Sequence, residues 1–300
     1  MIANTEKGTL KQLLVTTLVI TVLFLIFSYF LAIPLGSLMF FSTTDGAKMS
    51  SEFRHFHILL FFIFGFYIPV AFNAGQVFLF LEALYSICLI AAWKSRESFL
   101  KVIGKGFLDP IKRLFSNFLF IMPVLTSMLL TMVIGISSLQ ETAGVPTGEI
   151  PPTENPFEMF LELTYAPIIE EIGFRIIPFA IFFIVYLLLV GEKSATTSFW
   201  RRVKLVLIAV FDPDRAKRMV GAKNVKDFGV KDGITTSEWV LIILTSFIFG
   251  LAHYFLGGGW GPGKISTAFI DGFVFALVYL IYGAYAPILL HWFFNYYLQV

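Results

Sequence analysis

The stretch YAPIIEEIGFRIIPFAIFFIVYLLLV, residues 165–190, places three ionisable side chains inside a run that is otherwise suited to lipid. A charge at the centre of a bilayer costs at least ~2.5–3.5 kcal/mol, so these side chains must face the protein, pair with one another, or carry out chemistry. On a helix, Glu171 and Arg175 lie on one face and can pair. Glu170 has no such counter-charge nearby. This stretch alone leaves two interpretations open: a buried structural ion pair with a spare carboxylate, or a functional site.

The composition of the whole chain predicts the class of fold. Of 300 residues, 57% are hydrophobic, 14% are charged and 36 are Phe. A soluble domain of this length does not need so much apolar surface, so we predict an all-α polytopic integral membrane protein, expected in the cell membrane. The single cysteine, Cys88, excludes an intramolecular disulfide and a cysteine-based metal cluster. The lipid bilayer is therefore an expected partner, and nucleic acid is not.

The apolar runs predict a bundle of seven or eight transmembrane helices. They are residues 13–41, 57–93, 118–139, 156–190, 239–255, 267–282 and the segment that follows Pro287. The run 57–93 is too long for one simple crossing, so it forms one crossing or two, with a division near Asn73. Pro167 cannot donate a hydrogen bond to the preceding turn, so a kink is expected one turn before Glu170.

The polar segments between these runs indicate how the chain is organised. We predict one integral membrane domain, residues 1–300, with N-terminal helices within 1–139 and C-terminal helices within 157–300. A basic polar insertion interrupts the C-terminal helices at about 191–238. Residues 94–117 form a second basic segment, whose amphipathic pattern is typical of a helix on a membrane surface. Because Lys and Arg favour the cytoplasmic side, both basic segments are expected there.

Two later apolar runs carry a histidine each. His253 lies near the end of the run 239–255, while His291 and Asn295 lie on one face of the last helix. A single histidine in a membrane helix is most often a helix–helix hydrogen bond. Antiparallel neighbouring helices, however, bring these residues to the depth of Glu170. The shared depth favours one polar intramembrane site enclosed by the bundle.

These groups are suited to the hydrolysis of an amide bond. A carboxylate such as Glu170 can take a proton from water, and a neutral histidine can orient that water. His291 and Asn295 can donate hydrogen bonds to the developing oxyanion, where the loss of one donor typically costs ~10²–10³ in rate. A metal is the competing account, because Glu170, His253 and His291 would make a zinc-type ligand set. The HExxH motif is absent and the three residues come from three helices, so we predict no metal and no other cofactor.

Together these motifs resemble the CPBP family of intramembrane proteases, which includes type II CAAX prenyl endopeptidases and bacterial Abi proteins. The family pattern is EExxxR, then FxxxH, then HxxxN or a variant, on separate helices. It reads here as Glu170-Glu171 to Arg175, Phe249 to His253, and His291 to Asn295. Each motif is short, but the ordered set is specific. The resemblance covers about residues 157–300, and the residues before them match only as generic spans.

The resemblance implies a glutamate-dependent intramembrane endopeptidase, with 157–300 as its catalytic helices. Glu170 and His253 would activate water. His291 and Asn295 would form the oxyanion hole. Glu171 and Arg175 would brace the site. The implied partner is a peptide or membrane-protein substrate, prenylated or not.

Other classes of function fit part of the pattern. A non-catalytic scaffold or immunity-type protein of the same fold would have no need for all four polar residues. A proton-coupled transporter also uses glutamate and histidine inside the membrane, but its polar groups form a path across, whereas these share one depth. A zinc-dependent protease, with Glu170, His253 and His291 as ligands, is the remaining alternative.

Overall fold

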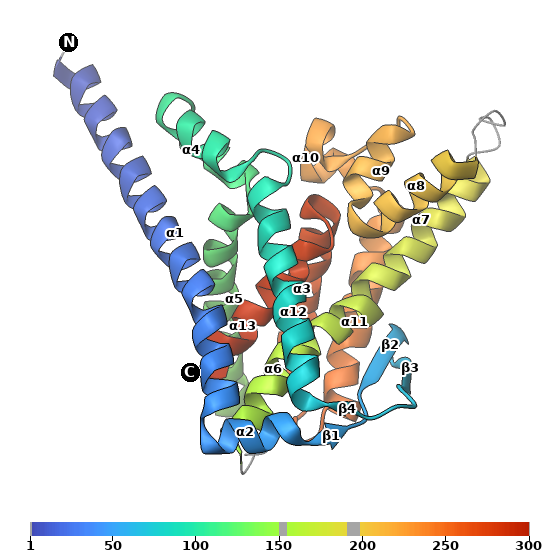
Figure 1. Ribbon diagram of the computed structural model, residues 1–300. Coiled ribbons are helices and arrows are strands. Elements are labelled where there is room, and N and C mark those ends of the chain that lie inside the picture. Colours follow the sequence, from blue (N-terminus) through green and yellow to red (C-terminus); the bar gives the residue numbers. More distant parts are fainter. Residues whose placement is uncertain (1, 150–154, 191–198, 300) are drawn as a thin grey trace. The chain divides into compact units, whose positions relative to one another are not determined.

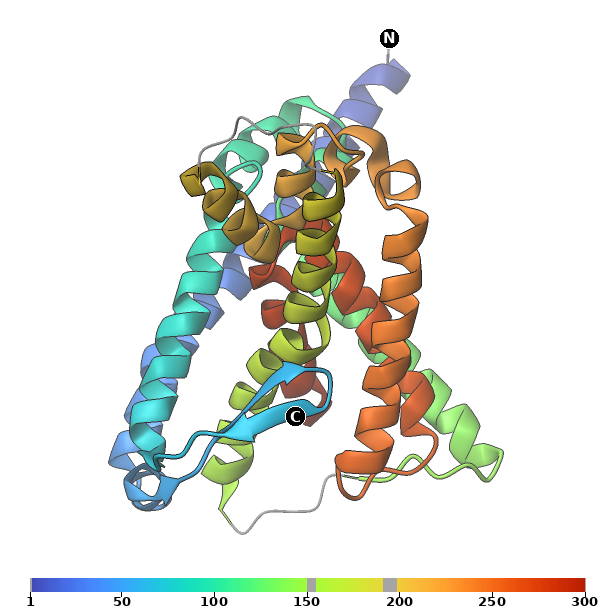
Figure 2. The ribbon, with the colours of Figure 1, turned by 90° about the vertical axis from the view of Figure 1, so that its right-hand side faces the viewer.

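The computed structural model describes residues 2–149, 155–190 and 199–299 (Figures 1 and 2). Its helices are α1 (Ile2–Ser42), α2 (Thr44–Ser51), α3 (Ala74–Lys94), α4 (Phe99–Leu108), a 3₁₀ helix (Ile111–Ser116), α5 (Phe118–Thr142), α6 (Pro156–Glu171), a π-helical turn (Ile172–Ile176), α7 (Ile177–Val190), α8 (Phe199–Phe211), α9 (Pro213–Met219), α10 (Val225–Gly233), α11 (Thr236–Leu256), α12 (Lys264–Tyr282) and α13 (Tyr285–Gln299). Its strands are β1 (Phe53–Arg54), β2 (His57–Phe61), β3 (Phe64–Tyr67) and β4 (Phe72–Asn73).

The chain divides into two compact units. One unit consists of Met1–Phe53 and Asn73–Ser127, and the other of Arg54–Phe72 and Met128–Val300. All the predicted site residues belong to the second unit, which therefore contains everything needed to describe the site.

The first unit contains α1, α2, α3 and α4. Helices α1 and α3 pack through the stacked rings of Phe40 and Phe78, whose centroids lie 4.4 Å apart. On the same two helices, the Ser37 hydroxyl donates a 2.5 Å hydrogen bond to the carboxylate of Glu82. This acidic residue within an apolar run therefore has a protein partner, as the cost of an isolated charge in lipid requires.

The prediction of a helix over the first part of the run 57–93 is wrong, and so the fold is not all-α. An antiparallel hairpin of β2 and β3 forms there, with His57 opposite Tyr67, and α3 begins only after its cap residue, Asn73. Aromatic residues and isoleucine fit strands as well as they fit apolar helices, and this segment is rich in both. The division expected near Asn73 is confirmed, and the run supplies one long helix, not two.

Helix α6 begins as its sequence predicts. The Asn155 side chain accepts a 2.9 Å hydrogen bond from the amide of Phe157, and Pro156 takes the first helical position. The helix continues through Pro167. Its departure from α geometry comes later, at the π-helical turn that follows Glu171.

Helices α11, α12 and α13 pack in sequence, α11 against α12 and α12 against α13. Gly250 on α11 permits the close approach, because a β-carbon there would lie 2.5 Å from the carbonyl oxygen of Ile265. The π-helical turn contacts both α11 and α12, and α13, which carries His291 near its middle, packs against α12 and α6. These helices and α6 therefore form the frame of the site.

Within the described residues, five helical segments are long and apolar enough to cross a membrane. They are Thr9–Ser42, Ala74–Leu108, Phe118–Thr142, Thr236–Leu256 and Lys264–Tyr282. This confirms a predominantly helical membrane protein. The predicted spans 118–139, 239–255 and 267–282 correspond to α5, α11 and α12. The number falls short of seven because α6, α7 and α13 are each shorter than a full crossing, with 16, 14 and 15 residues.

The basic insertion forms α8, α9 and α10 where it is described, and its first part, 191–198, lies outside the described residues. Lys217 on α9 is buried and donates to both carboxylate oxygens of Glu238, each at 2.9 Å. Glu238 also forms a capping box with Thr235 at the start of α11. The insertion is therefore anchored to α11 by a buried, hydrogen-bonded ion pair.

Candidate active site

A π-helical turn, Ile172–Ile176, follows directly on the acidic pair at the end of α6. Pro178 has no N–H, so it cannot donate to the carbonyl of Gly173 five residues before it. The amide of Phe62, in the turn between β2 and β3, donates to that carbonyl instead, at 2.8 Å. A β-carbon on Gly173 would lie 2.6 Å from the Cβ of Leu59, so glycine allows the hairpin to come this close. The hairpin is thus attached to the helix beside the acidic pair.

Glu171 and Arg175 form the ion pair that their spacing predicts. Nη1 of Arg175 donates to Oε1 of Glu171 at 3.2 Å, and neither side chain is exposed. The guanidinium carbon lies 3.9 Å from the ring centroid of Phe249 and 5.6 Å from that of Phe275, a cation–π arrangement. Gly272 leaves room for the arginine, since a β-carbon there would lie 2.7 Å from Nη2. The pair is therefore part of the packed interior.

His291 lies between the two glutamates. Its Nδ1 is 2.8 Å from Oε1 of Glu171, and its ring stacks on Phe275 with the centroids 4.6 Å apart. A carboxylate paired with arginine only accepts hydrogen bonds, so we assign the proton to this nitrogen. Nε2 then faces Oε2 of Glu170, at 3.6 Å. Glu171 therefore sets the orientation of the ring that faces Glu170.

His253 approaches the same oxygen of Glu170 from α11. Its Nε2 lies 3.9 Å from Oε2 of Glu170. Its Nδ1 lies 3.0 Å from the carbonyl oxygen of Phe249, and because a carbonyl only accepts, we assign the proton of the neutral ring to Nδ1. The Nε2 that faces Glu170 is then an acceptor. A carboxylate and an imidazole, both able to accept, stand side by side.

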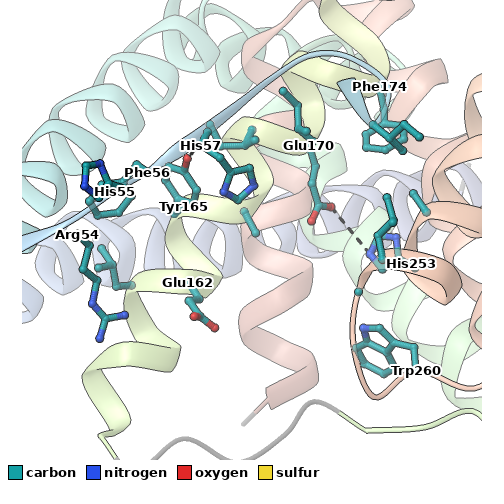
Figure 3. Close-up of a pocket in the computed structure, with 18 residues that line it drawn as sticks. Arg54, His55, Phe56, His57, Glu162, Tyr165, Glu170, Phe174, His253 and Trp260 are labelled. Carbon is teal, nitrogen blue, oxygen red and sulfur yellow. Dashed lines mark hydrogen bonds and ion pairs between the residues drawn. The ribbon is translucent and has the colours of Figure 1, made fainter. Parts of the chain in front are cut away.

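A cavity of about 510 Å³ lies in front of this pair (Figure 3). Glu170 and His253 line it, with side chains 24% and 20% exposed, although the Oε2 atom of Glu170 that faces both histidines is itself buried and has no hydrogen-bond partner among the described residues. His291 is buried behind them at 4% exposure and does not line the cavity. The lining residues come from the β2–β3 region (Arg54, His55, Phe56, His57, Leu59, Ile63), from α6 and the π-helical turn (Leu161, Glu162, Tyr165, Ala166, Ile169, Glu170, Phe174), and from α11 and the loop after it (Ala252, His253, Leu256, Gly257, Trp260).

The predicted site residues do not all meet. Glu170, His253 and His291 converge on one carboxylate oxygen. Asn295 lies one turn beyond His291 on α13, is partly exposed, and does not line the cavity. The expectation that the two histidines share one cavity with Glu170 therefore holds for His253 alone, although His291 is the nearer of the two to Glu170.

The convergent residues do not form a ready metal centre. Over the described parts of the chain, no group of three or more His, Cys, Asp or Glu side chains is arranged to hold a metal ion. Both Nδ1 atoms face oxygen acceptors of the protein, and both Nε2 atoms are directed at Oε2 of Glu170, at 3.9 and 3.6 Å. Histidines held in this way through Nδ1 are also found around bound metals, so the ring orientations alone do not separate the two accounts.

Sequence reasoning does not find the hairpin side of the cavity. The Tyr165 hydroxyl donates to the carbonyl of His57, the two rings lie 5.8 Å apart, and Trp260, in the loop after α11, lies across the cavity from them beside His253 (Figure 3). No spacing rule connects these residues, because they come from three segments far apart in the chain. The α6 wall of the cavity can be predicted from the sequence, because Glu162, Ala166 and Glu170 are spaced four residues apart and therefore share one helix face.

The fold and the site together define a helical integral membrane protein in which a glutamate and a histidine face a cavity. Residues 152–297 match the model of the family described as type II CAAX prenyl endopeptidase Rce1-like. This match confirms the resemblance that the three motifs predict, and it supports a CAAX-type membrane protease in general for that part of the chain. No curated protein and no solved structure matches the chain.

Proposed function

We propose that this protein is a glutamate-dependent intramembrane endopeptidase. One observation carries the proposal: Glu170 and His253 are neighbouring acceptors, 3.9 Å apart, on the wall of a cavity large enough to admit part of a peptide. The family supports hydrolysis of a peptide bond in a membrane. The geometry supports these two residues as the groups that activate water.

The reaction begins with a water molecule within ~2.8 Å of both acceptors, which donates one hydrogen bond to each. Glu170 takes a proton as the water oxygen bonds to the scissile carbonyl carbon, and a tetrahedral intermediate forms. The intermediate then collapses, the carbon–nitrogen bond breaks, and Glu170 returns the proton to the departing amine. His253 orients the water throughout.

The developing oxyanion needs donors, and we propose His291 and Asn295 for this role. Both ring nitrogens of His291 face carboxylates, and Nδ1 donates its proton to Glu171. The ring can therefore donate to the oxyanion through Nε2 only when the imidazole carries a proton on both nitrogens. Asn295 would join it with substrate bound, because catalytic hydrogen bonds often tighten only in the complex. Glu171 and Arg175 act through His291, as positioning residues.

We also propose seven membrane crossings. Helical structure runs without a break from Pro156 to Val190, which corresponds to ~50 Å and suffices for one crossing. Helix α13, with 15 residues, would make a short crossing of ~22 Å beside it. Added to the five long segments, these give seven.

The test uses the purified protein in lipid nanodiscs with a pool of membrane-segment peptides, and mass spectrometry to detect cleavage. We expect cleavage by the wild type and none by Glu170→Gln, which keeps the shape of the side chain but cannot act as a base. Asp232→Asn is the matched control, since it removes an exposed carboxylate on α10 outside the cavity. Cleavage by Glu170→Gln at the rate of the control would overturn the proposal.

A further inference from the structure

We propose that Glu162 gives this protein a preference for substrates that carry a lysine or arginine three or four residues from the scissile bond. The inference rests on the proposed protease function, because it extends the same cavity away from Glu170. Three features support it: the course of the cavity along α6, an unbalanced negative charge at the far end, and aromatic rings beside that charge.

The cavity follows one face of α6. Glu162, Ala166 and Glu170 recur at four-residue intervals, and all three line it. The distance from Glu162 to Glu170 is ~12 Å along the axis, at ~1.5 Å per residue. An extended peptide advances ~3.3 Å per residue, so three or four of its residues span this distance. A substrate whose scissile bond lies at Glu170 therefore presents its third or fourth neighbour to Glu162.

The end of the cavity at Glu162 carries a net negative charge. Arg54 lies 2.7 Å from Glu158 and pairs with it, so those two charges balance. Glu162 is exposed, and within the described residues no hydrogen bond or ion pair to it is found; Arg54 and Glu158 act on it only as more distant charges. Figure 3 shows its carboxylate turned away from Arg54. A cation on the substrate would supply the missing partner.

Aromatic rings beside Glu162 suit the same cation. Tyr165 lies one turn further along α6, and its ring meets that of Phe56 edge to face with the centroids 5.4 Å apart. Its hydroxyl is held by the carbonyl of His57, which fixes the ring at the cavity wall. An ammonium or guanidinium group is attracted to such ring faces, and the carbon stem of a long basic side chain can lie along apolar Leu161.

The rest of the cavity selects a different kind of residue. Leu59, Ile63 and Leu256 also line it, and Trp260 lies on the same side as His253 (Figure 3). The substrate class that fits is therefore a peptide with apolar residues around the scissile bond and one basic residue at a fixed distance from it.

The experiment measures binding apart from cleavage. Glu170→Gln protein in nanodiscs is incubated with a library of short randomised peptides, and the bound peptides are sequenced. The same selection is made with Glu162→Gln, with Glu162→Lys and with the matched control Asp232→Asn, each in the Glu170→Gln background. A parallel reaction of the library with wild-type protein locates the scissile bond by mass spectrometry.

We expect basic residues to be enriched roughly two- to fivefold with Glu170→Gln and with the Asp232→Asn control, as a partly exposed ion pair would give. Glu162→Gln should abolish the enrichment, and Glu162→Lys should replace it with a preference for acidic residues, which a merely misfolded variant would not do. An unchanged preference in both Glu162 variants, or none in Glu170→Gln, overturns the inference. Basic enrichment without any cleavage by the wild type would support this binding site and contradict the proposed function.

Discussion

Glu171 makes more hydrogen bonds within the site than Glu170 does, so its substitution should lower the free energy of unfolding. Its Oε1 accepts from Arg175 at 3.2 Å and from His291 at 2.8 Å, in full burial. Glu171→Gln would leave the arginine as a buried charge without its ionic partner. Removing one partner of a buried pair typically lowers the free energy of unfolding by ~3–5 kcal/mol. Thermal and denaturant unfolding in one detergent would measure this loss.

Glu170→Gln is the matched control for that variant, because it makes the same substitution one residue earlier. The Glu170 side chain is 24% exposed, and its histidine neighbours lie 3.6 and 3.9 Å away, beyond hydrogen-bond distance. Its unfolding should therefore stay close to that of the wild type while hydrolysis is lost. Equal destabilisation by both substitutions would mean that the acidic pair is a structural feature and nothing more.

At the scale of single residues, the sequence predicts contacts between residues that are close together along the chain. The Glu171–Arg175 pair follows from helix geometry alone, since residues four apart share a face. The bond from His291 to Glu171 joins residues 120 positions apart, and no spacing rule can find it. Matching helix depth brought the histidines to the level of the acidic pair, but it could not say which glutamate each would face.

Among the elements, the hairpin and the π-helical turn form one contact that a single substitution can disturb. Gly173→Ala would place a β-carbon 2.6 Å from the Cβ of Leu59 and 3.2 Å from the carbonyl oxygen of Phe62. Either the hairpin or the turn must shift, and overpacking of this kind typically costs ~1–3 kcal/mol. We expect lower thermal stability and a slower reaction, because the hairpin forms one wall of the cavity in front of Glu170.

Gly135→Ala on α5 is the control for this prediction. A β-carbon there meets nothing within 4 Å, and alanine in a helix interior is favoured over glycine by up to ~1 kcal/mol. This variant should unfold at or above the wild-type temperature and keep its rate. If Gly173→Ala behaves in the same way, the close approach of hairpin and turn does not matter for the site.

The elements show where hydropathy stops being informative. It located α5, α11 and α12, because long apolar runs bounded by polar residues leave few alternatives to a helix. It could not separate the hairpin from α3, since a run of phenylalanine, leucine and isoleucine is as apolar in a strand as in a helix. It also could not place the π-helical turn, which depends on a carbonyl that Pro178 leaves free and Phe62 satisfies from a distant segment.

For the whole molecule, composition was sufficient to establish the class but not the number of crossings. A chain that is 57% hydrophobic must meet lipid, and five long apolar helices agree with that. The two further crossings that we propose depend on shorter apolar helices that pack against protein neighbours; α13, for example, packs against both α6 and α12. Length rules treat each helix alone, so they do not count short helices whose polar backbone ends are covered by neighbouring helices.

The last prediction concerns the metal content of the intact protein. We expect purified protein to cleave its substrates without a stoichiometric metal ion, because Glu170 and His253 already offer two acceptors to one water molecule and the described His, Cys, Asp and Glu side chains include no group arranged as a metal site. Elemental analysis of active protein, together with rates before and after dialysis against a chelator, tests this. A dependence of rate on pH would not decide, since zinc-bound water and a glutamate base both titrate. If zinc is present at one per chain, and activity disappears on its removal and returns with its addition, then Glu170, His253 and His291 must rearrange into ligands and the glutamate mechanism is wrong.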